Sequence, residues 1–105
     1  RDKKTQPNVR VTSPSEEELT NRQTLFLSAL ITPGQDRIIT KISYIIDVVA
    51  VETKSGLAIK KESSVRSSYK PKNLTDGKHN LTIRVEDDFG NFAEQTISFT
   101  YQSNS

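Results

Sequence analysis

The alternation of apolar and polar side chains between residues 79 and 87 is the feature that most constrains how this chain can fold. Leu81, Ile83 and Val85 share one parity, and the residues between them are polar. Successive side chains of a β-strand point to opposite faces, so a period of two indicates a strand with one buried and one solvated face. Because turn-forming residues flank the run on both sides, the pattern predicts an antiparallel hairpin.

The two flanking turns are rich in aspartate, asparagine and glycine. An aspartate at the first turn position can accept backbone N–H groups, and a glycine at the fourth can adopt a positive φ. We therefore assign structural turn roles to Asp76, Gly77, Asp87, Gly90 and Asn91. Carboxylates in such loops can also bind calcium, but no Asp-x-Asp-x-Asp-Gly run is present. Turn formation explains these residues, so we predict no metal site and no cofactor.

Weaker alternation predicts further strands along the chain. We expect them at residues 8–12, 24–31, around 42–46, 79–87 and 92–101, with one or two edge strands within 58–69. After Asp47, continuing apolar residues predict either a strand that extends and kinks or a bulge that switches its face. Residues 15–18 have capping-box spacing, which leaves a helical turn and a polar loop equally open. About seven strands without a convincing helix indicate an all-β sandwich.

Length and composition bound the class of protein. The chain has 105 residues, enough for one domain, which we place at residues 8–101 between linkers at 1–7 and 102–105. Its 15 basic and 13 acidic side chains are interspersed, which argues against a nucleic-acid partner. No apolar run approaches the roughly 18 residues of a membrane span, so we expect no direct membrane insertion. With Arg1 first and no signal peptide, the chain is expected to be part of a longer protein.

Three segments carry a resemblance to a known family. They are Val9-Arg-Val-Thr-Ser-Pro14, Ile42-Ser-Tyr-Ile-Ile-Asp47, and the run from Leu74 to Ala93 that contains the hairpin. In this order they resemble bacterial immunoglobulin-like modules, in which the middle segment is a central strand that usually ends in an Asp-Gly turn; here Val48 follows Asp47 in place of glycine. The resemblance implies an immunoglobulin-like antiparallel β-sandwich of about seven strands. It also implies a bacterial surface or secreted protein, located extracellularly, whose partners include neighbouring domains of the same chain.

Residues able to perform catalysis are scarce. Cysteine is absent and His79 is the single histidine, so neither a Cys/His dyad nor a zinc cluster can form. His79 shares the parity of Leu81, which predicts that it caps the end of the core near the turn. No serine is marked as a nucleophile by its surroundings. We therefore predict no catalytic residues and no enzyme activity.

A basic middle segment supplies the candidate binding residues. These are Lys60, Lys61, Arg66 and Lys70, followed by Lys72, and we add Phe89 as an exposed aromatic at a turn tip. The basic group either solvates an edge strand, where lysines discourage aggregation, or binds an anionic polymer of the cell wall or a glycan. The leading hypothesis is a non-catalytic module for spacing, positioning or contact with another surface protein. The alternative is an accessory domain that holds an attached enzyme on an anionic polymer.

Overall fold

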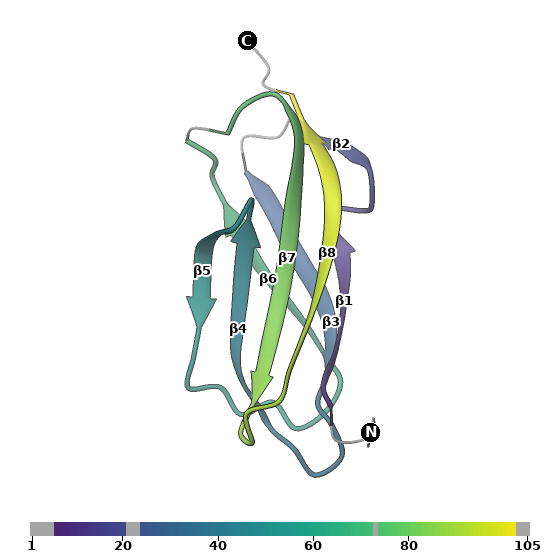
Figure 1. Ribbon diagram of the computed structural model, residues 1–105, viewed down its shortest axis with the longest axis vertical. Coiled ribbons are helices and arrows are strands. Elements are labelled where there is room, and N and C mark those ends of the chain that lie inside the picture. Colours follow the sequence, from purple (N-terminus) through teal and green to yellow (C-terminus); the bar gives the residue numbers. More distant parts are fainter. Residues whose placement is uncertain (1–5, 21–23, 73, 103–105) are drawn as a thin grey trace.

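Two packed β-sheets make up the protein in a computed structural model that describes residues 6–20, 24–72 and 74–102 (Figure 1). The strands are β1 (Asn8–Ser13), β2 (Glu18–Thr20), β3 (Leu25–Thr32), β4 (Ile39–Ile46), β5 (Val49–Lys54), β6 (Ser63–Tyr69), β7 (Gly77–Asp87) and β8 (Phe92–Tyr101). One sheet has the order β1-β3-β6, and the other has the order β2-β8-β7-β4-β5. No helix long and apolar enough to cross a membrane occurs among these described residues.

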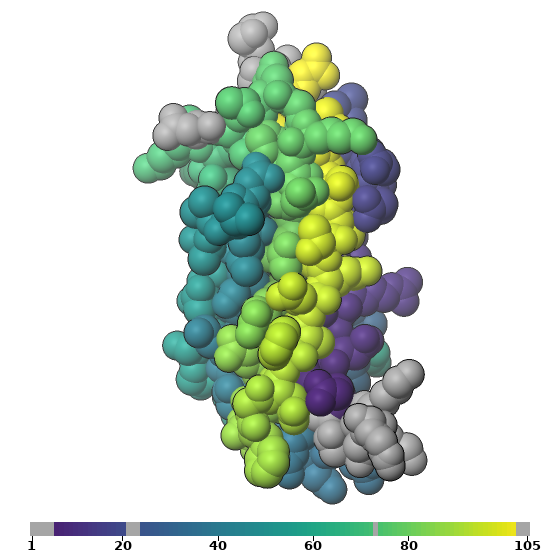
Figure 2. Space-filling model, viewed as in Figure 1, coloured from purple at the N-terminus to yellow at the C-terminus, as the bar shows by residue number. Residues whose placement is uncertain are grey.

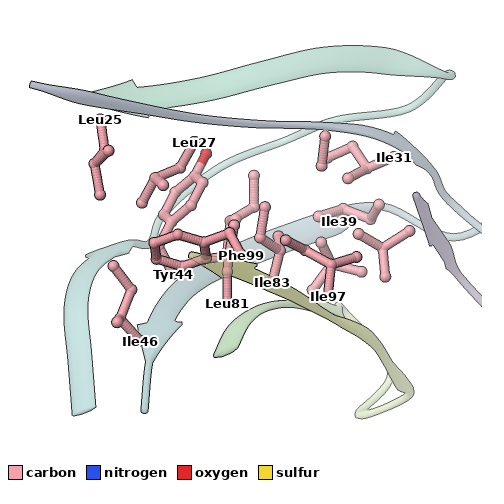
Figure 3. Packing of buried hydrophobic residues seen from close by; sticks show 14 residues of the cluster. Leu25, Leu27, Ile31, Ile39, Tyr44, Ile46, Leu81, Ile83, Ile97 and Phe99 are labelled. Carbon is pink, nitrogen blue, oxygen red and sulfur yellow. The ribbon is translucent and has the colours of Figure 1, made fainter. Parts of the chain in front are cut away.

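The buried faces follow the alternation seen in the sequence. Leu81, Ile83 and Val85 of β7 are completely buried, as are Leu27 and Ile31 of β3 in the opposite sheet. Figure 3 shows Leu81 and Ile83 meeting Leu27 and Ile31 between the two layers. The prediction of an all-β immunoglobulin-like sandwich is confirmed, because each long central strand contributes one apolar face to a shared core.

The strand β2 is an addition to the predicted set, and it makes the only parallel pair among the described strands, with β8. The backbone N–H of Ser15 donates to Glu18 Oε1 at 2.8 Å, and Glu18 N donates to Ser15 O at 3.0 Å. The capping-box contact therefore forms, but it closes a turn and not a helix. The chain leaves that turn as a strand because Leu19 pairs with Thr100 of β8. A strand of three residues is too short to show alternation in the sequence.

The chain reverses direction at Asp47 and Val48, so both expectations for this region were wrong. Asp47 has a φ of 50° and Val48 a φ of 67°, and Ile46 pairs with Val49 directly across the turn. Positive φ at both central positions is what a two-residue hairpin of type I′ requires. Valine at such a position hid the turn, since glycine or asparagine normally marks it.

The weakly patterned region within residues 58–69 contains one strand, β6, at the free edge of the three-stranded sheet. The first strand begins near the lower end of the molecule and β8 ends near the upper end (Figure 1). The molecule measures 49 Å along this axis and 25 Å across it. Of the expected linkers, residues 1–5 and 103–105 lie outside the described residues.

Candidate interaction surface

The basic residues predicted to bind a ligand are all exposed, but they lie in two groups. Lys60 and Lys61 precede β6 in the connection from β5, whereas Lys70 follows β6 at its other end. A strand rises roughly 3.3 Å per residue, so the seven residues of β6 separate the groups by about 20 Å. Arg66 lies between them on β6. The structure thus does not bring the four residues together in one patch.

An apolar hollow lies at the upper end, between β5 and the connection from β6 to β7. Its volume is about 490 Å³. Five apolar or aromatic side chains line it, together with Asp47, Lys70 and Lys72: Ile46, Val49, Val51, Tyr69 and Leu74. Figure 2 shows the green connection projecting at the upper left, above the teal tip of the β4–β5 hairpin. Lys70 therefore lies beside apolar surface rather than on an open polar face.

A second hollow, of about 470 Å³, continues along the same two strands. It is lined by Glu52 and Lys54 of β5, by Arg66 and two serines of β6, and by Phe26 of β3. The Lys54 ammonium donates to the Arg66 carbonyl oxygen at 3.2 Å, and Ser67 bonds through its hydroxyl to Glu52. We call the two hollows together the β5–β6 seam.

The seam is the open side of the sandwich, because β5 and β6 are the edge strands of different sheets. The chain crosses between the two sheets on both sides, from β5 to β6 at the seam and from β1 to β2 on the opposite side. There the N–H of Val11 donates to Gln95 Oε1 at 2.6 Å, and Glu17 N donates to Ser98 O at 2.6 Å. Between β5 and β6 themselves, the hydrogen bonds among the described residues come from the side chains of Lys54, Glu52 and Ser67.

Phe89 lies at the tip of the β7–β8 turn, at the lower end, and 74% of its surface is exposed. The guanidinium of Arg37 lies over its ring, 4.3 Å from the centroid. Phe89 is therefore remote from the seam. Phe92, which begins β8, is 48% exposed and has Arg84 stacked 3.8 Å from its ring centroid. Both rings lie against a cation, a contact that attracts through the ring quadrupole.

The turn that carries Phe89 is built around Asp87, which is 6% exposed. Asp87 Oδ1 accepts the N–H groups of Phe89 at 2.9 Å and Asn91 at 2.8 Å, and Oδ2 accepts Asn91 Nδ2 at 3.0 Å. Gly90 has a φ of 88°, in the region that side chains disfavour. At the other end of β7, Asp76 precedes Gly77, whose φ is 123°. The carboxylate of Asp87 is thus fully engaged in shaping the turn.

His79 is buried at the upper end of the core, beside the ring of Phe99. Its Nδ1 contacts Asp47 Oδ2, and its Nε2 lies 2.6 Å from the Thr75 carbonyl oxygen. Burial by itself lowers the pKa of His79. The hydrogen bond to Thr75 and the hydrogen bond and charge of Asp47 outweigh burial and raise the pKa above 6.5. Both ring nitrogens face acceptors, an arrangement that the imidazolium satisfies with its two N–H donors.

Asp47 is the counterpart of this contact. Burial by itself raises the pKa of Asp47. The N–H of Asn80 donates to Asp47 Oδ1 at 2.9 Å. This hydrogen bond and the charge of His79 outweigh burial and lower the pKa below 3.8. The histidine thus caps the core as the sequence predicted. With both nitrogens engaged it has none to offer as a general base. Among the described residues, no group of three or more histidine, cysteine or acidic side chains is placed to hold a metal ion.

Several surface features escaped sequence reasoning. Val48 is 96% exposed and Val49 is 60% exposed, although both read as strand interior. Glu52 and Lys54 of β5 face the seam, because they pair with the inward residues Tyr44 and Ile42. Their placement depends on the Asp47–Val48 turn, which the sequence pattern did not reveal. Tyr69, at the end of β6, packs partly against the core.

Comparison with known proteins agrees with this architecture. Residues 12–101 match the family described as bacterial Ig-like domain. No protein with a curated description matches the chain. The fold is similar to the fibronectin(III)-like modules of Clostridium thermocellum CbhA, with a TM-score of 0.69 and 15% identity over 94% of this chain and 48% of that chain.

Two other structures are similar in fold. An engineered protein has a TM-score of 0.62 and 13% identity over 94% of this chain and 21% of that chain. CopC from Methylosinus trichosporium OB3b has a TM-score of 0.50 and 16% identity over 93% of this chain and 97% of that chain. This chain spans less than half the length of the first two structures. The family match covers most of the described strands, and the chain belongs to the bacterial Ig-like domain family.

Proposed function

We propose that this chain is a non-catalytic module that spaces and positions neighbouring domains in a bacterial surface or secreted protein. Ig-like and fibronectin(III)-like folds are typically non-catalytic modules, and such modules are often extracellular. The observation that carries the proposal is the placement of the ends. The strand β1 starts at one end of a 49 Å axis and β8 finishes at the other (Figure 1).

The anchoring of both end strands supports a spacer role. Next to the start of β1, Gln6 Nε2 donates to Asn91 Oδ1 at 3.3 Å in the β7–β8 turn. At the other end, the N–H of Gln102 donates to the Thr20 carbonyl oxygen at 3.0 Å. A pull on either end therefore acts on strands paired within the sandwich and not on loose loops. Such an arrangement transmits a fixed separation from one domain to the next.

A fluorescence energy-transfer experiment tests this proposal. The chain has no cysteine, so Asn8→Cys, at the exposed start of β1, with Gln102→Cys introduces two unique labelling positions and keeps the Gln6 contact. Single-molecule distances between dyes at these positions should form one narrow distribution below the 49 Å that the whole molecule spans. A pair at Gln102→Cys and Asp76→Cys, both near the upper end, serves as the short-distance control. A broad distribution, or ends that lie as close as the control pair, would contradict a rigid spacer.

The second candidate, binding of an anionic wall polymer through Lys60, Lys61, Arg66 and Lys70, has weaker support. Lys60 and Lys61 precede β6 and Lys70 follows it, with Arg66 alone between these two groups. Exposed charges about 20 Å apart are separated by more than a Debye length at physiological ionic strength. A polyanion would therefore contact the two groups independently.

A further inference from the structure

We propose that the β5–β6 seam binds an extended acidic peptide, which adds as a strand to the free edge of β5. Strand addition to an exposed sheet edge is a general mode of peptide recognition, in which the main chain supplies affinity and alternate side chains supply specificity. The proposal concerns a partner of the module and holds independently of its role as a spacer. Three properties of the seam support it: a free edge, an apolar floor and an unbalanced positive charge.

The free edge is the outer side of β5, the last strand in its sheet. Among residues 6–20, 24–72 and 74–102, no strand pairs with that side. Ile46 and Val49 flank the two-residue turn and form the hydrogen-bonded pair of the hairpin. The next pair, Ile45 with Ala50, is therefore not hydrogen-bonded, and Ala50 directs its N–H and C=O groups outward. Ala50 is exposed, so an incoming strand can reach these groups.

The apolar floor is the upper hollow of about 490 Å³, which lies within the usual range for ligand pockets. Val51, Tyr69 and Leu74 line it and also pack against the core, so the floor is a surface extension of the core itself. A register shift leaves Val51 as an extra, bulged residue of β5, so an added strand would pair regularly on either side of Val51 and place alternate side chains over this surface. Polysaccharides and polyphosphates carry no such side chains, so the floor favours a peptide over an anionic polymer.

The charge of the seam favours acidic residues in that peptide. Four cationic side chains line the two hollows: Lys54, Arg66, Lys70 and Lys72. The two anionic side chains, Glu52 and Asp47, already bond to Ser67 and His79. The like charges of Lys54 and Arg66 would also oppose edge-to-edge pairing with a second copy of this chain. A strand of opposite charge removes that repulsion.

The test measures binding of a fluorescein-labelled peptide of eight residues that alternates valine and glutamate, by fluorescence anisotropy at physiological salt. Saturable binding is expected, and the same peptide with lysine in place of glutamate should bind at least tenfold more weakly. The double variant Lys70→Glu with Lys72→Glu should also lose at least tenfold. Its matched control is Lys60→Glu with Lys61→Glu, which makes the same charge change outside the seam and should bind within twofold of the unaltered chain.

Strand addition is tested separately from charge. A peptide N-methylated at alternate residues cannot pair along one edge and should not bind. Ala50→Pro removes the outward N–H and should weaken binding, provided that its circular dichroism melt shows a folded protein; the N-methylated peptide gives the same test without altering the chain. The proposal is overturned if the valine–glutamate peptide fails to bind, if the N-methylated peptide or polyphosphate binds equally well, or if the two double variants lose equally. Concentration-dependent dimerisation that the peptide does not disrupt would also overturn it.

Discussion

At the scale of the residue, His79 joins three segments of the chain. It lies on β7, contacts Asp47 in the β4–β5 turn and faces the Thr75 carbonyl in the connection from β6. Asp47 also accepts the N–H of Asn80, so the turn is fixed against β7 by two acceptor atoms of one carboxylate. The side chain of His79 thereby holds the β4–β5 turn and the connection from β6 to β7 against the upper end of the core.

The raised pKa of His79 predicts a pH-dependent stability. A group whose pKa is higher in the folded state contributes its full stabilisation below the unfolded value, here 6.5, and loses it as the pH rises through the folded value. The urea midpoint of the unaltered protein should therefore fall between pH 6 and pH 9. His79→Gln should be less stable at pH 6, and the difference between the two proteins should shrink at high pH. A difference that stays constant across this range would contradict the charged contact.

Tyr44 gives a second prediction at this scale. Its side chain is completely buried and points toward Leu27 of the opposite sheet (Figure 3). Among the described residues its hydroxyl has no hydrogen-bond partner, and burial, followed by the charge of Glu52, raises its pKa to about 12. An unpartnered buried hydroxyl costs roughly 1–3 kcal/mol, so Tyr44→Phe should stabilise the protein by about 1 kcal/mol in urea unfolding. Tyr69→Phe, at the half-buried seam, is the control and should change little. A loss of stability in Tyr44→Phe would show that the hydroxyl is satisfied.

At the scale of the element, the β4–β5 hairpin holds a β-branched residue in a conformation that such residues disfavour. Val48 has a φ of 67° and is almost fully exposed, so no packing offsets the strain. The hairpin persists because Asp47 is tied to His79 and Asn80. Strain of this kind costs about 1–3 kcal/mol.

Val48→Gly should therefore stabilise the protein by about 1 kcal/mol, because glycine adopts positive φ freely and an Asp-Gly pair suits this turn. Val49→Gly is the matched control: it removes the same side chain one residue later, within β5, and should destabilise. Thermal unfolding of the two variants measures both effects. If Val48→Gly melts at a lower temperature than the unaltered protein, the turn is not strained.

The central strand β7 gives the sharpest contrast between its two faces. Ile83 is completely buried, whereas its neighbour Thr82 faces outward. The hydroxyl of Thr82 is hydrogen-bonded to the hydroxyl of Thr96 on β8 at 2.7 Å. Ile83→Ala should cost about 2–5 kcal/mol, as large-to-small changes in a core do. Thr82→Ala should cost about 1 kcal/mol or less, because it loses one exposed hydrogen bond. Equal losses for the two variants in urea unfolding would contradict the assigned faces.

These elements show how far the sequence alone reaches. Strands such as β7 and β8 are predictable because one face of each is solvated and alternation records burial. The residue pattern did not predict the β4–β5 turn, since Val48 carries none of the chemistry that marks a type I′ turn; only the family resemblance pointed to a turn after Asp47. The three-residue β2 is too short to show a period. The seam was not predictable either, because it depends on the β4–β5 turn. Only the reversal of the chain at Asp47 places Lys54 beside Arg66.

At the scale of the whole molecule, the two lateral sides of the sandwich differ. On one side the chain passes from β1 to β2, and backbone N–H groups of Val11 and Glu17 hydrogen-bond to the other sheet. The other is open along β5 and β6 and carries both hollows that form the seam. The strand β1 begins near the lower end of the long axis and β8 ends near the upper end, both away from this open side (Figure 1). A spacer with one accessible lateral edge can join neighbours end to end and still bind a partner from the side.

Amide hydrogen exchange followed by NMR tests this account most directly, because it reports the buried sheet and the free edge at once. The amides of Leu81 and Ile83, on a strand paired with both β4 and β8, should exchange only on global unfolding. The outward amide of Ala50 on β5 should exchange many orders of magnitude faster. Rapid exchange throughout β7, or an Ala50 amide as protected as that of Ile83, would contradict the two-layer arrangement with an open β5 edge.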